Sequence, residues 1–482
     1  MQQADIFQQR RSGVLLHISS LPSGNMGDDA YRFVDFLQEA GVSVWQMLPL
    51  GPTHNDRSPY QCLSAHAGNP RLICRERLKA QSWARADELN ESDISTLLAQ
   101  AYAQFIRYAG EKAQQAFGKF CEQQQHWLDD YVLFQELRCL NQSMAWFNWP
   151  PELRDRQPEA LEKVKSERKE AIDIRRFEQF IFFQQWQQLR TYANERGVKL
   201  FGDMPIFVAH DSADVWAEPH LFTLDETGQP THVAGVPPDY FSETGQRWGN
   251  PLYEWSQHIE QNFDWWQRRL QTLLACFDLV RIDHFRGFES CWEIPADCET
   301  AVQGQWVKAP GEQLFDSLLA SFGELPLVAE DLGIITPEVT ALRERYAMPG
   351  MKILQFAFGD DASNPYLPHQ HCQDSVVYTG THDNNTTLGW YQTLDEHAKA
   401  HLHAYLGESH EAMPWLLIRT AISSVSELAV IPMQDLLSLD GAHRMNTPGT
   451  TEGNWLWQFT WEMLDDGIAP RLRGLNELYG RS

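Results

Sequence analysis

Eight short apolar segments, several of them ending in polar or acidic residues, constrain the fold of this 482-residue chain more than any other feature. Each segment is almost continuously apolar, which is typical of strands buried on both faces. The segments are VLLHI (14–18), VWQMLPL (44–50), KLFGDM (199–204), LVRIDH (279–284), LVAED (327–331), MKILQF (351–356), VVYT (376–379) and AVIP (429–432). Helical patterns separate most of them, for example at 30–40 and 263–277.

Repeated strand-then-helix units predict a parallel sheet, and eight of them favour a closed (β/α)₈ TIM barrel over an open, doubly wound sheet. No Gly-x-Gly-x-x-Gly follows a strand, which argues against the nucleotide-binding alternative. We predict one catalytic domain over residues 1–482. Within it, the charged segment 75–197 is predicted to be a helical insertion between the second and third strands. Segment 210–255, rich in Gly, Pro and aromatic residues, is predicted to be a loop region on the barrel rim.

Charge and composition narrow the class of ligand. The formal net charge is −26, which disfavours nucleic acid and membranes as partners but does not repel a neutral substrate. The eight cysteines are dispersed without a Cys-x-x-Cys, so we expect free thiols. Residues 1–12 lack the apolar core of a signal peptide, so we expect a cytoplasmic protein. Eighteen Trp residues suggest stacking platforms for sugar rings.

Four carboxylates follow predicted strands, at the end of a barrel where catalytic groups lie: Asp203, Asp283, Glu330 and Asp383. Asp283 and Glu330 close consecutive strands, so we expect them to face each other across one small cavity. A glycosidic bond needs this arrangement, because one carboxylate attacks the anomeric carbon while one carboxylic acid protonates the leaving oxygen. For a retaining mechanism we expect the two carboxyl groups to lie about 5–5.5 Å apart. Asp383 is placed to stabilise positive charge in the transition state.

The two central acids need different ionisation states. Arg281 lies two residues before Asp283, so strand alternation points both side chains to one face, where the arginine favours the anionic form of Asp283. Glu330 follows the apolar residues 327–329 and lies near the expected Asp283 anion. Both features raise the pKa of a carboxyl group, so we expect Glu330 to be protonated near neutral pH.

Other site types fit less well. Three histidines close predicted strands, and we expect them to donate hydrogen bonds to sugar hydroxyls: His17, His284 and His382. The cluster of His369, His371, Cys372 and Asp374 lacks a recognised ligand spacing, so we predict no metal site. The Gly-x-Ser-x-Gly elbow of serine hydrolases is absent from the sequence. We expect no organic cofactor.

Several motifs with these residues resemble those of the amylomaltases, the 4-α-glucanotransferases of glycoside hydrolase family 77. The resemblance covers nearly the whole chain. It rests on SPYQ (58–61), GDMPIFV (202–208), PPDYFSETGQRWGNPLY (237–253), RIDHFRGF (281–288), WVKAPG (306–311), AEDLG (329–333), PGMKILQFAF (349–358), GTHDN (380–384) and GNW (453–455). It implies a barrel with insertions and without a separate C-terminal β-domain.

The same resemblance implies roles for individual residues. Asp283 matches the nucleophile, Glu330 the acid/base and Asp383 the third carboxylate of the family. The positions that the resemblance assigns to sugar binding are Tyr60 as the platform, Arg281 and His382 in the cleavage subsite, Asp203, Trp248, Phe356 and Asn454 along the cleft, and Tyr240 and Phe241 on a loop arching over it.

The leading hypothesis is therefore a retaining 4-α-glucanotransferase. It implies α-1,4-glucans of maltotriose length and longer as donors, and glucans or glucose as acceptors. An aromatic roof over residues 240–248 would hold an acceptor and displace water, which favours transfer over hydrolysis. Two alternatives stay open at this point: an α-amylase-type hydrolase and a non-catalytic glucan-binding protein. Donor length, cyclic products, oligomeric state and pathway are left open.

Overall fold

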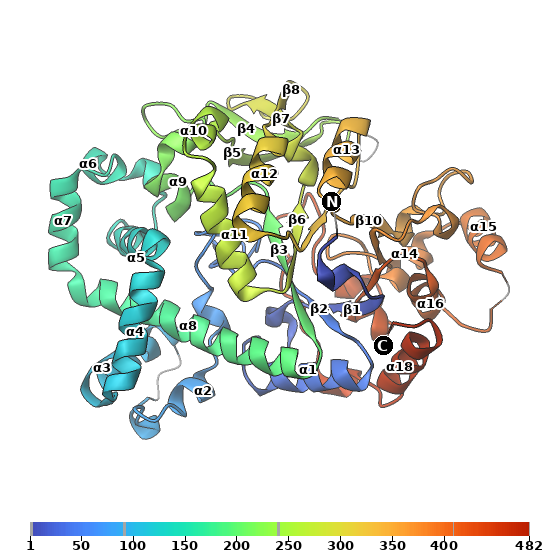
Figure 1. Cartoon of the computed structure of the whole chain (residues 1–482), viewed down its shortest axis with the longest axis horizontal. Helices are drawn as coiled ribbons and strands as arrows, with labels where there is room; N and C mark the ends of the chain where they lie inside the picture. The colour runs from blue at the N-terminus through green and yellow to red at the C-terminus, as the bar shows by residue number, and fades with distance from the viewer. Residues whose placement is uncertain (1–2, 90–92, 239–241, 408, 482) are drawn as a thin grey trace.

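The computed structural model describes residues 3–89, 93–238, 242–407 and 409–481. Eight parallel strands form one sheet, in the order β10–β11–β12–β1–β2–β3–β6–β9. The sheet closes where the Ala329 N–H at the end of β9 donates to the Pro349 carbonyl, just before β10, at 2.9 Å. This architecture confirms the predicted (β/α)₈ barrel (Figure 1). The strands are β1 (Arg11–Leu15), β2 (Val44–Gln46), β3 (Lys199–Pro205), β6 (Leu279–Asp283), β9 (Leu327–Ala329), β10 (Gly350–Ile353), β11 (Ser375–Tyr378) and β12 (Leu428–Pro432).

Every predicted segment overlaps a strand, but the predicted and observed boundaries differ, and two segments illustrate the reason. The first strand begins at Arg11 because Arg11 and Ser12 pair with β12, and residues 18–20 form a short 3₁₀ turn instead. Residues 354–356, predicted as strand, also form a 3₁₀ turn. Apolar runs report burial, whereas strand ends depend on which neighbour supplies hydrogen bonds, and a run of buried residues does not contain that information.

Alternate strand residues face two different cores. Leu15, Phe201 and Met351 point into the barrel, while Trp45 and Val280 point outward and pack against the surrounding helices. These helices include α1 (Asp28–Glu39), α11 (Asp264–Cys276), α12 (Gly311–Phe322), α13 (Pro337–Arg345), α16 (Trp415–Ser423) and α18 (Ile468–Leu478). Four further helices follow barrel strands or their loops: α10 (Trp255–Glu260), α14 (Thr387–Thr393), α15 (Glu396–Leu406) and α17 (Met433–Leu436).

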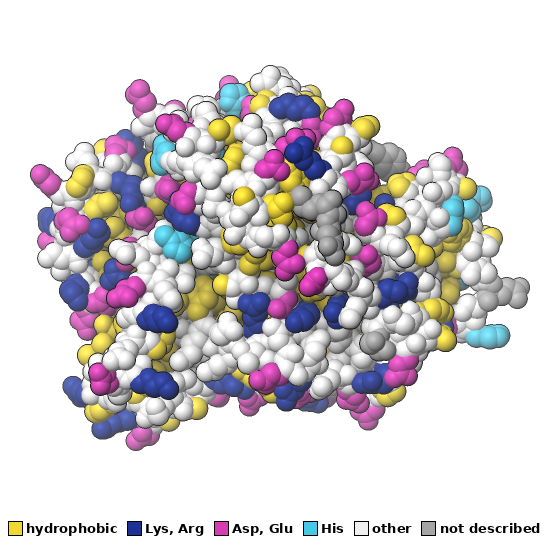
Figure 2. Space-filling view, in the orientation of Figure 1, with side chains coloured by type: hydrophobic (Ala, Val, Ile, Leu, Met, Phe, Trp, Pro, Cys, Tyr) yellow, Lys and Arg dark blue, Asp and Glu magenta, His cyan; other side chains and the backbone are white. Residues whose placement is uncertain are grey.

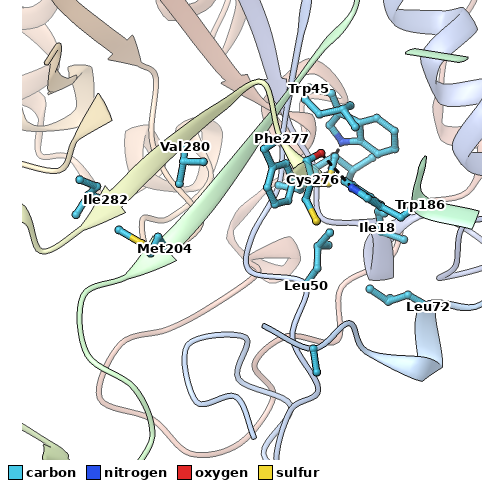
Figure 3. Close-up of a cluster of buried hydrophobic side chains, with 14 of the residues drawn as sticks. Ile18, Trp45, Leu50, Leu72, Trp186, Met204, Cys276, Phe277, Val280 and Ile282 are labelled. Atoms are coloured by element: carbon cyan, nitrogen blue, oxygen red, sulfur yellow. Dashed lines mark hydrogen bonds between the residues drawn. The ribbon is translucent and has the colours of Figure 1, made fainter. Parts of the chain in front are cut away.

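Figure 3 shows part of the outer core, where Trp45, Trp186 and Phe277 lie together. The Trp186 indole donates to the Cys276 carbonyl at 3.1 Å, so its one polar atom is satisfied although the ring is buried. Packing and a hydrogen bond therefore connect the helix that carries Trp186 to the end of α11, just before β6.

The segment predicted as an insertion is helical in its described residues, and it extends to one side of the barrel (Figure 1). Its helices are α2 (Arg75–Lys79), α3 (Ile94–Tyr108), α4 (Glu111–Gln123), α5 (Gln125–Leu140), α6 (Pro151–Arg154), α7 (Pro158–Glu167) and α8 (Lys169–Glu195). Helix α8 contacts α3, α4, α5 and α7, and it also contacts α1 and β3 of the barrel. It thereby connects the two parts, and the division of the chain at residues 75 and 197 stays a prediction.

The predicted rim loop contains regular structure that the sequence analysis does not foresee. Within it lie α9 (Ala213–Ala217), β4 (His232–Val236) and β5 (Gln246–Pro251), and an antiparallel sheet of order β5–β4–β7–β8 joins these strands to β7 (Ser290–Pro295) and β8 (Gln305–Lys308). Strands β4 and β7 are far apart in sequence, and a Gly- and Pro-rich composition hides such pairing. This rim sheet carries Trp248 on β5 to the edge of the barrel.

None of the helices in the described ranges combines the length and apolar character that a membrane span requires. Figure 2 shows Lys and Arg side chains scattered among Asp and Glu side chains over the face in view, on a chain whose net charge is −26. The eight cysteines are all free thiols.

Candidate functional site

The four predicted carboxylates meet at one end of the barrel. Asp203 lies on β3, Asp283 ends β6, Glu330 follows β9, and Asp383 lies beyond β11. Parallel strands present their carboxyl ends on one face, so residues from distant parts of the sequence converge there. The register places Asp203 opposite Arg281 on the neighbouring strand β6. The strand ends thus place acids and one arginine in a single site.

Arg281 holds two of these acids at once. Its Nη1 donates to Asp203 Oδ2 and its Nη2 to Asp283 Oδ1, both at 2.7 Å. The Tyr60 hydroxyl donates to the same Asp203 oxygen at 2.7 Å. Burial lowers the pKa of Arg281, but the Asp203 and Asp283 carboxylates outweigh burial and hold that pKa above its usual range. The guanidinium is therefore a permanent, buried cation that fixes the position of both carboxylates.

The backbone holds Glu330. Its Oε2 accepts the His284 N–H at 2.8 Å and its Oε1 accepts the Leu332 N–H at 3.0 Å. Burial, followed by the nearby Asp283 anion, raises the pKa of Glu330 to about 7, in the direction expected from the sequence. Near neutral pH this carboxyl group therefore carries a proton in a substantial fraction of molecules.

Asp283 differs from the sequence-based expectation in one respect. Arg281 favours its anion, as expected, but burial is the larger effect, and the Asp203 and Asp383 carboxylates add to burial. Together they raise the pKa of Asp283 to about 6. The order of the two values still makes Asp283 the more acidic of the pair, so the state with Asp283 ionised and Glu330 protonated is the favoured singly protonated state.

Asp383 is held by His382, which the sequence analysis named, and by Asn446 and Arg444, which it missed. Its Oδ1 accepts a 2.6 Å hydrogen bond from Asn446, its Oδ2 lies 3.3 Å from His382 Nε2, and its carbonyl accepts from Arg444 at 2.8 Å. Burial raises the pKa of Asp383, but His382 and Asn446 reverse this and hold it well below its usual range. Arg444 and Asn446 lie in the segment after the eighth strand, β12, at the same end of the barrel as the acids. Their position after a barrel strand could have identified them as candidates from the sequence.

Three rings form one wall of the site. The Tyr60 ring stacks on His382, with centroids 5.2 Å apart and planes 14° apart. The centroid of the Trp455 ring lies 5.9 Å from that of Tyr60 and 6.0 Å from that of His382. The sequence analysis chose Asn454 from this motif, but the Asn454 side chain bonds within its own loop, to Thr447 and Thr450. Trp455 therefore makes the aromatic contact with Tyr60 and His382, and the Asn454 side chain stabilises the loop that carries Trp455.

A second aromatic group lies on the side of the rim sheet. The rings of Trp248 and His284 meet edge to face at 4.7 Å, and Phe207 lies 6.4 Å from each. Phe356 lies after β10 and contacts Tyr366. Two residues predicted to arch over the cleft, Tyr240 and Phe241, lie outside the described residues.

Three further histidines from the sequence analysis are His17, His369 and His371. His17 is close to His382, and burial together with that neighbour lowers the pKa of His17 to about 4, so it is neutral near pH 7. His369 pairs with the Tyr405 hydroxyl and His371 with the Tyr366 carbonyl, both at 2.8 Å. Across the described ranges, no three His, Cys, Asp or Glu side chains group in a way that would hold a metal ion.

Comparisons with known proteins bear on this geometry. A protein-family model described as 4-alpha-glucanotransferase, of glycoside hydrolase family 77, matches residues 16–464. The 4-alpha-glucanotransferase of Thermus thermophilus is 49% identical, over 97% of this chain and 98% of that protein. The chloroplastic/amyloplastic 4-alpha-glucanotransferase of Solanum tuberosum is 41% identical, over 98% of this chain and 87% of that protein.

Solved structures agree with the sequence comparisons. Amylomaltase from Streptococcus agalactiae, in complex with acarbose, has a TM-score of 0.93 and 37% identity, and the match covers 98% of this chain and all of that one (100%). Amylomaltase from Corynebacterium glutamicum has a TM-score of 0.73 at 19% identity, covering 99% of this chain and 75% of that one, which supports the fold alone.

The shared guanidinium leads to a stability prediction. Arg281→Met leaves Asp203 and Asp283 buried without a counter-charge, so we expect the free energy of unfolding at pH 8 to fall by about 3–5 kcal/mol. The deficit relative to the parent should shrink at pH 5, because the folded variant then binds protons that neutralise the uncompensated acids. Urea unfolding at both pH values measures this.

The matched control is the double variant Arg281→Met with Asp203→Asn, which removes one of the uncompensated charges. It should be more stable than Arg281→Met alone at pH 8. Equal stability of the single and double variants would show that Asp203 does not depend on the guanidinium.

Proposed function

The chain belongs to the 4-alpha-glucanotransferases of glycoside hydrolase family 77, and on this premise we propose which of its residues cut and rejoin the glucan. The family assignment agrees with the motifs in the sequence, and it sets aside the two alternatives, a hydrolase and a non-catalytic binding protein. The observation that carries the proposal is the pair of unequal acids, Asp283 beside Arg281 and Glu330 under two backbone N–H groups.

In the first step, the Asp283 carboxylate attacks the anomeric carbon of the donor. The bond from that carbon to the glycosidic oxygen breaks, and the proton of Glu330 moves to the departing oxygen. This step forms a glucosyl ester on Asp283 and releases the remainder of the donor with a free 4-hydroxyl group. The higher pKa of Glu330 and the lower pKa of Asp283 match these roles.

In the second step, the 4-hydroxyl of an acceptor glucan attacks the same carbon. Its proton moves to the Glu330 carboxylate, and the ester bond to Asp283 breaks. Two inversions leave the new linkage in the α configuration. The expected carboxyl separation of about 5–5.5 Å stays a prediction.

The neighbouring groups support the charge that develops on the sugar. Asp383 stays anionic because His382 and Asn446 lower its pKa, so its negative charge is available to the positively charged transition state. We assign to the stacked pair of Tyr60 and His382 the role of platform for the sugar in the cleavage subsite. Asp203 positions Arg281 and Tyr60 through its shared oxygen.

Transfer is faster than hydrolysis where the site binds and orients an acceptor hydroxyl more effectively than a water molecule. The Trp248, His284 and Phe207 rings offer a surface for an incoming glucan on the side of the rim sheet. We propose maltotriose and longer α-1,4-glucans as donors, and glucans or glucose as acceptors. The acarbose in the Streptococcus agalactiae relative supports an oligosaccharide ligand. A cytoplasmic location stays a prediction.

Maltotriose tests the assignment of the nucleophile. The parent protein should convert it into glucose and a ladder of longer oligosaccharides, separated by chromatography. Asp283→Asn removes the nucleophile and should lower the rate by at least ~10⁴-fold. The control is Asp360→Asn, which changes an exposed acid to which we assign no catalytic role and should keep the ladder. Transfer by Asp283→Asn at the parent rate would remove Asp283 from the mechanism.

The pH dependence follows from the two raised pKa values. Activity requires Asp283 ionised, so it falls as pH drops through about 6, and it requires Glu330 protonated, so it falls as pH rises through about 7. Because Asp283 and Glu330 interact, the two limbs of the pH profile report apparent pKa values of the pair and not of either residue alone. We expect kcat/KM for maltotriose to give a narrow bell with its maximum between these values. A plateau from pH 5 to 9 would contradict it.

The Asn446 hydrogen bond to Asp383 also affects catalysis in this scheme. Asn446→Ala removes a charge-assisted bond of about 1.5–3 kcal/mol, so we expect kcat to fall roughly 10- to 100-fold with a small change in KM. Binding of acarbose, whose amine is placed to mimic positive charge, should weaken more than binding of a neutral maltooligosaccharide. An equal loss for both ligands would indicate general loosening of the cleft instead.

A further inference from the structure

His284 has a backbone conformation that few side chains adopt. It directly follows β6 and the nucleophile, and its φ of 58° and ψ of 51° place it in the left-handed region. Residues with a Cβ are strained in this region, although Asn, Asp and His tolerate it better than most and Gly adopts it freely. Such strain persists only where the surrounding structure maintains it.

The left-handed turn places backbone donors around Glu330. The His284 N–H donates to Glu330 Oε2 at 2.8 Å, and the next N–H, that of Phe285, donates to the Glu330 carbonyl at 3.1 Å. In return, the Glu330 N–H donates to the Ile282 carbonyl at 3.0 Å. The turn at residue 284 therefore provides hydrogen bonds to both the side chain and the backbone of Glu330.

The rim sheet holds the His284 ring in place. Trp248 on β5 meets this ring edge to face at 4.7 Å, with planes 88° apart, and Phe207 lies 6.4 Å away. On a third side, a Cβ added at Gly287 would lie 3.2 Å from His284 Cδ2, so space there is tight. Burial, with Arg286 nearby, lowers the pKa of His284 to about 3, so the ring packs as a neutral group.

We propose that His284 is a positioning residue for Glu330, because its left-handed backbone, held by Trp248, aims the N–H group at the carboxyl that exchanges the proton. This inference rests on the proposed role of Glu330 as the acid/base. It assigns the backbone of residue 284 a function separate from any contact between its imidazole and sugar. It also links the rim sheet to the proton transfer, since Trp248 supports the ring.

The hydrogen bond has a defined effect on protonation. An N–H donated to a carboxylate favours the ionised form, so the His284 bond lowers the pKa of Glu330. The other groups that act on Glu330 are the Leu332 N–H, Arg281, Asp283 and the nearby Tyr366. A residue at 284 that leaves the left-handed region removes one of the two donors, and the pKa of Glu330 then rises.

The test compares substitutions by their tolerance of this conformation. His284→Gly and His284→Asn lose the imidazole but keep the left-handed backbone, whereas His284→Ala and His284→Val lose the imidazole and disfavour that backbone. We expect the alkaline limb of kcat/KM for maltotriose to stay within ~0.2 pH units for Gly and Asn. For Ala and Val the alkaline limb should move upward by about 0.5–1 pH unit, and kcat should be lower than in the Gly and Asn variants.

The outcomes separate the alternatives. If the imidazole acts only on sugar, all four variants raise KM alike and leave the limb unmoved, which overturns the proposal. An equal limb shift in Gly and Val also overturns it. If His284→Val fails to fold, His284→Ala carries the same comparison. Glu330→Gln distinguishes failure of the underlying assignment, because an unchanged transfer rate and alkaline limb in that variant would remove Glu330 itself from the mechanism.

Discussion

The guanidinium of Arg281 is shared by two carboxylates, and most of the site depends on this interaction. A buried cation without partners is costly, and so are buried acids without a cation, but the three together satisfy one another. Because Arg281 and Asp283 lie on the same face of one strand and Asp203 on the next, the interaction also fixes how β3 and β6 meet. The Tyr60 hydroxyl donates to the Asp203 oxygen that Arg281 also contacts, which connects the proposed aromatic platform to the proposed nucleophile, Asp283.

Chemistry in this site comes from acids in different surroundings. Burial raises the pKa of Asp283, Glu330 and Asp383 alike; it dominates for Asp283 and Glu330, whereas the partners of Asp383 reverse it. His382 and Asn446 lower the pKa of Asp383, which stays anionic. Two backbone N–H groups lower the pKa of Glu330, but burial and the neighbouring Asp283 anion raise it. These different surroundings match the three different roles that we propose for the carboxyl groups at this barrel mouth.

The rim sheet extends this site beyond the barrel. Strand β5 brings Trp248 against His284, and His284 donates its N–H to Glu330. The surface proposed for the acceptor and the proposed acid/base, Glu330, are therefore connected through a single residue. The segment after β12 contributes to the same site, because Trp455 contacts Tyr60 and Asn446 donates to Asp383. The site thus combines residues from distant parts of the chain.

Sequence alone determined the barrel, the eight strand positions and the acids at their ends, because burial and strand periodicity are local properties that a run of residues records directly. Its motifs also identified the family. It did not contain the rim sheet, the roles of Arg444, Asn446 and Trp455, or the left-handed turn at His284. Each of these depends on contacts between segments far apart in the chain, or on a backbone conformation that neighbours impose. The net pKa of Asp283 likewise followed from burial, which exists only once the chain has folded around it.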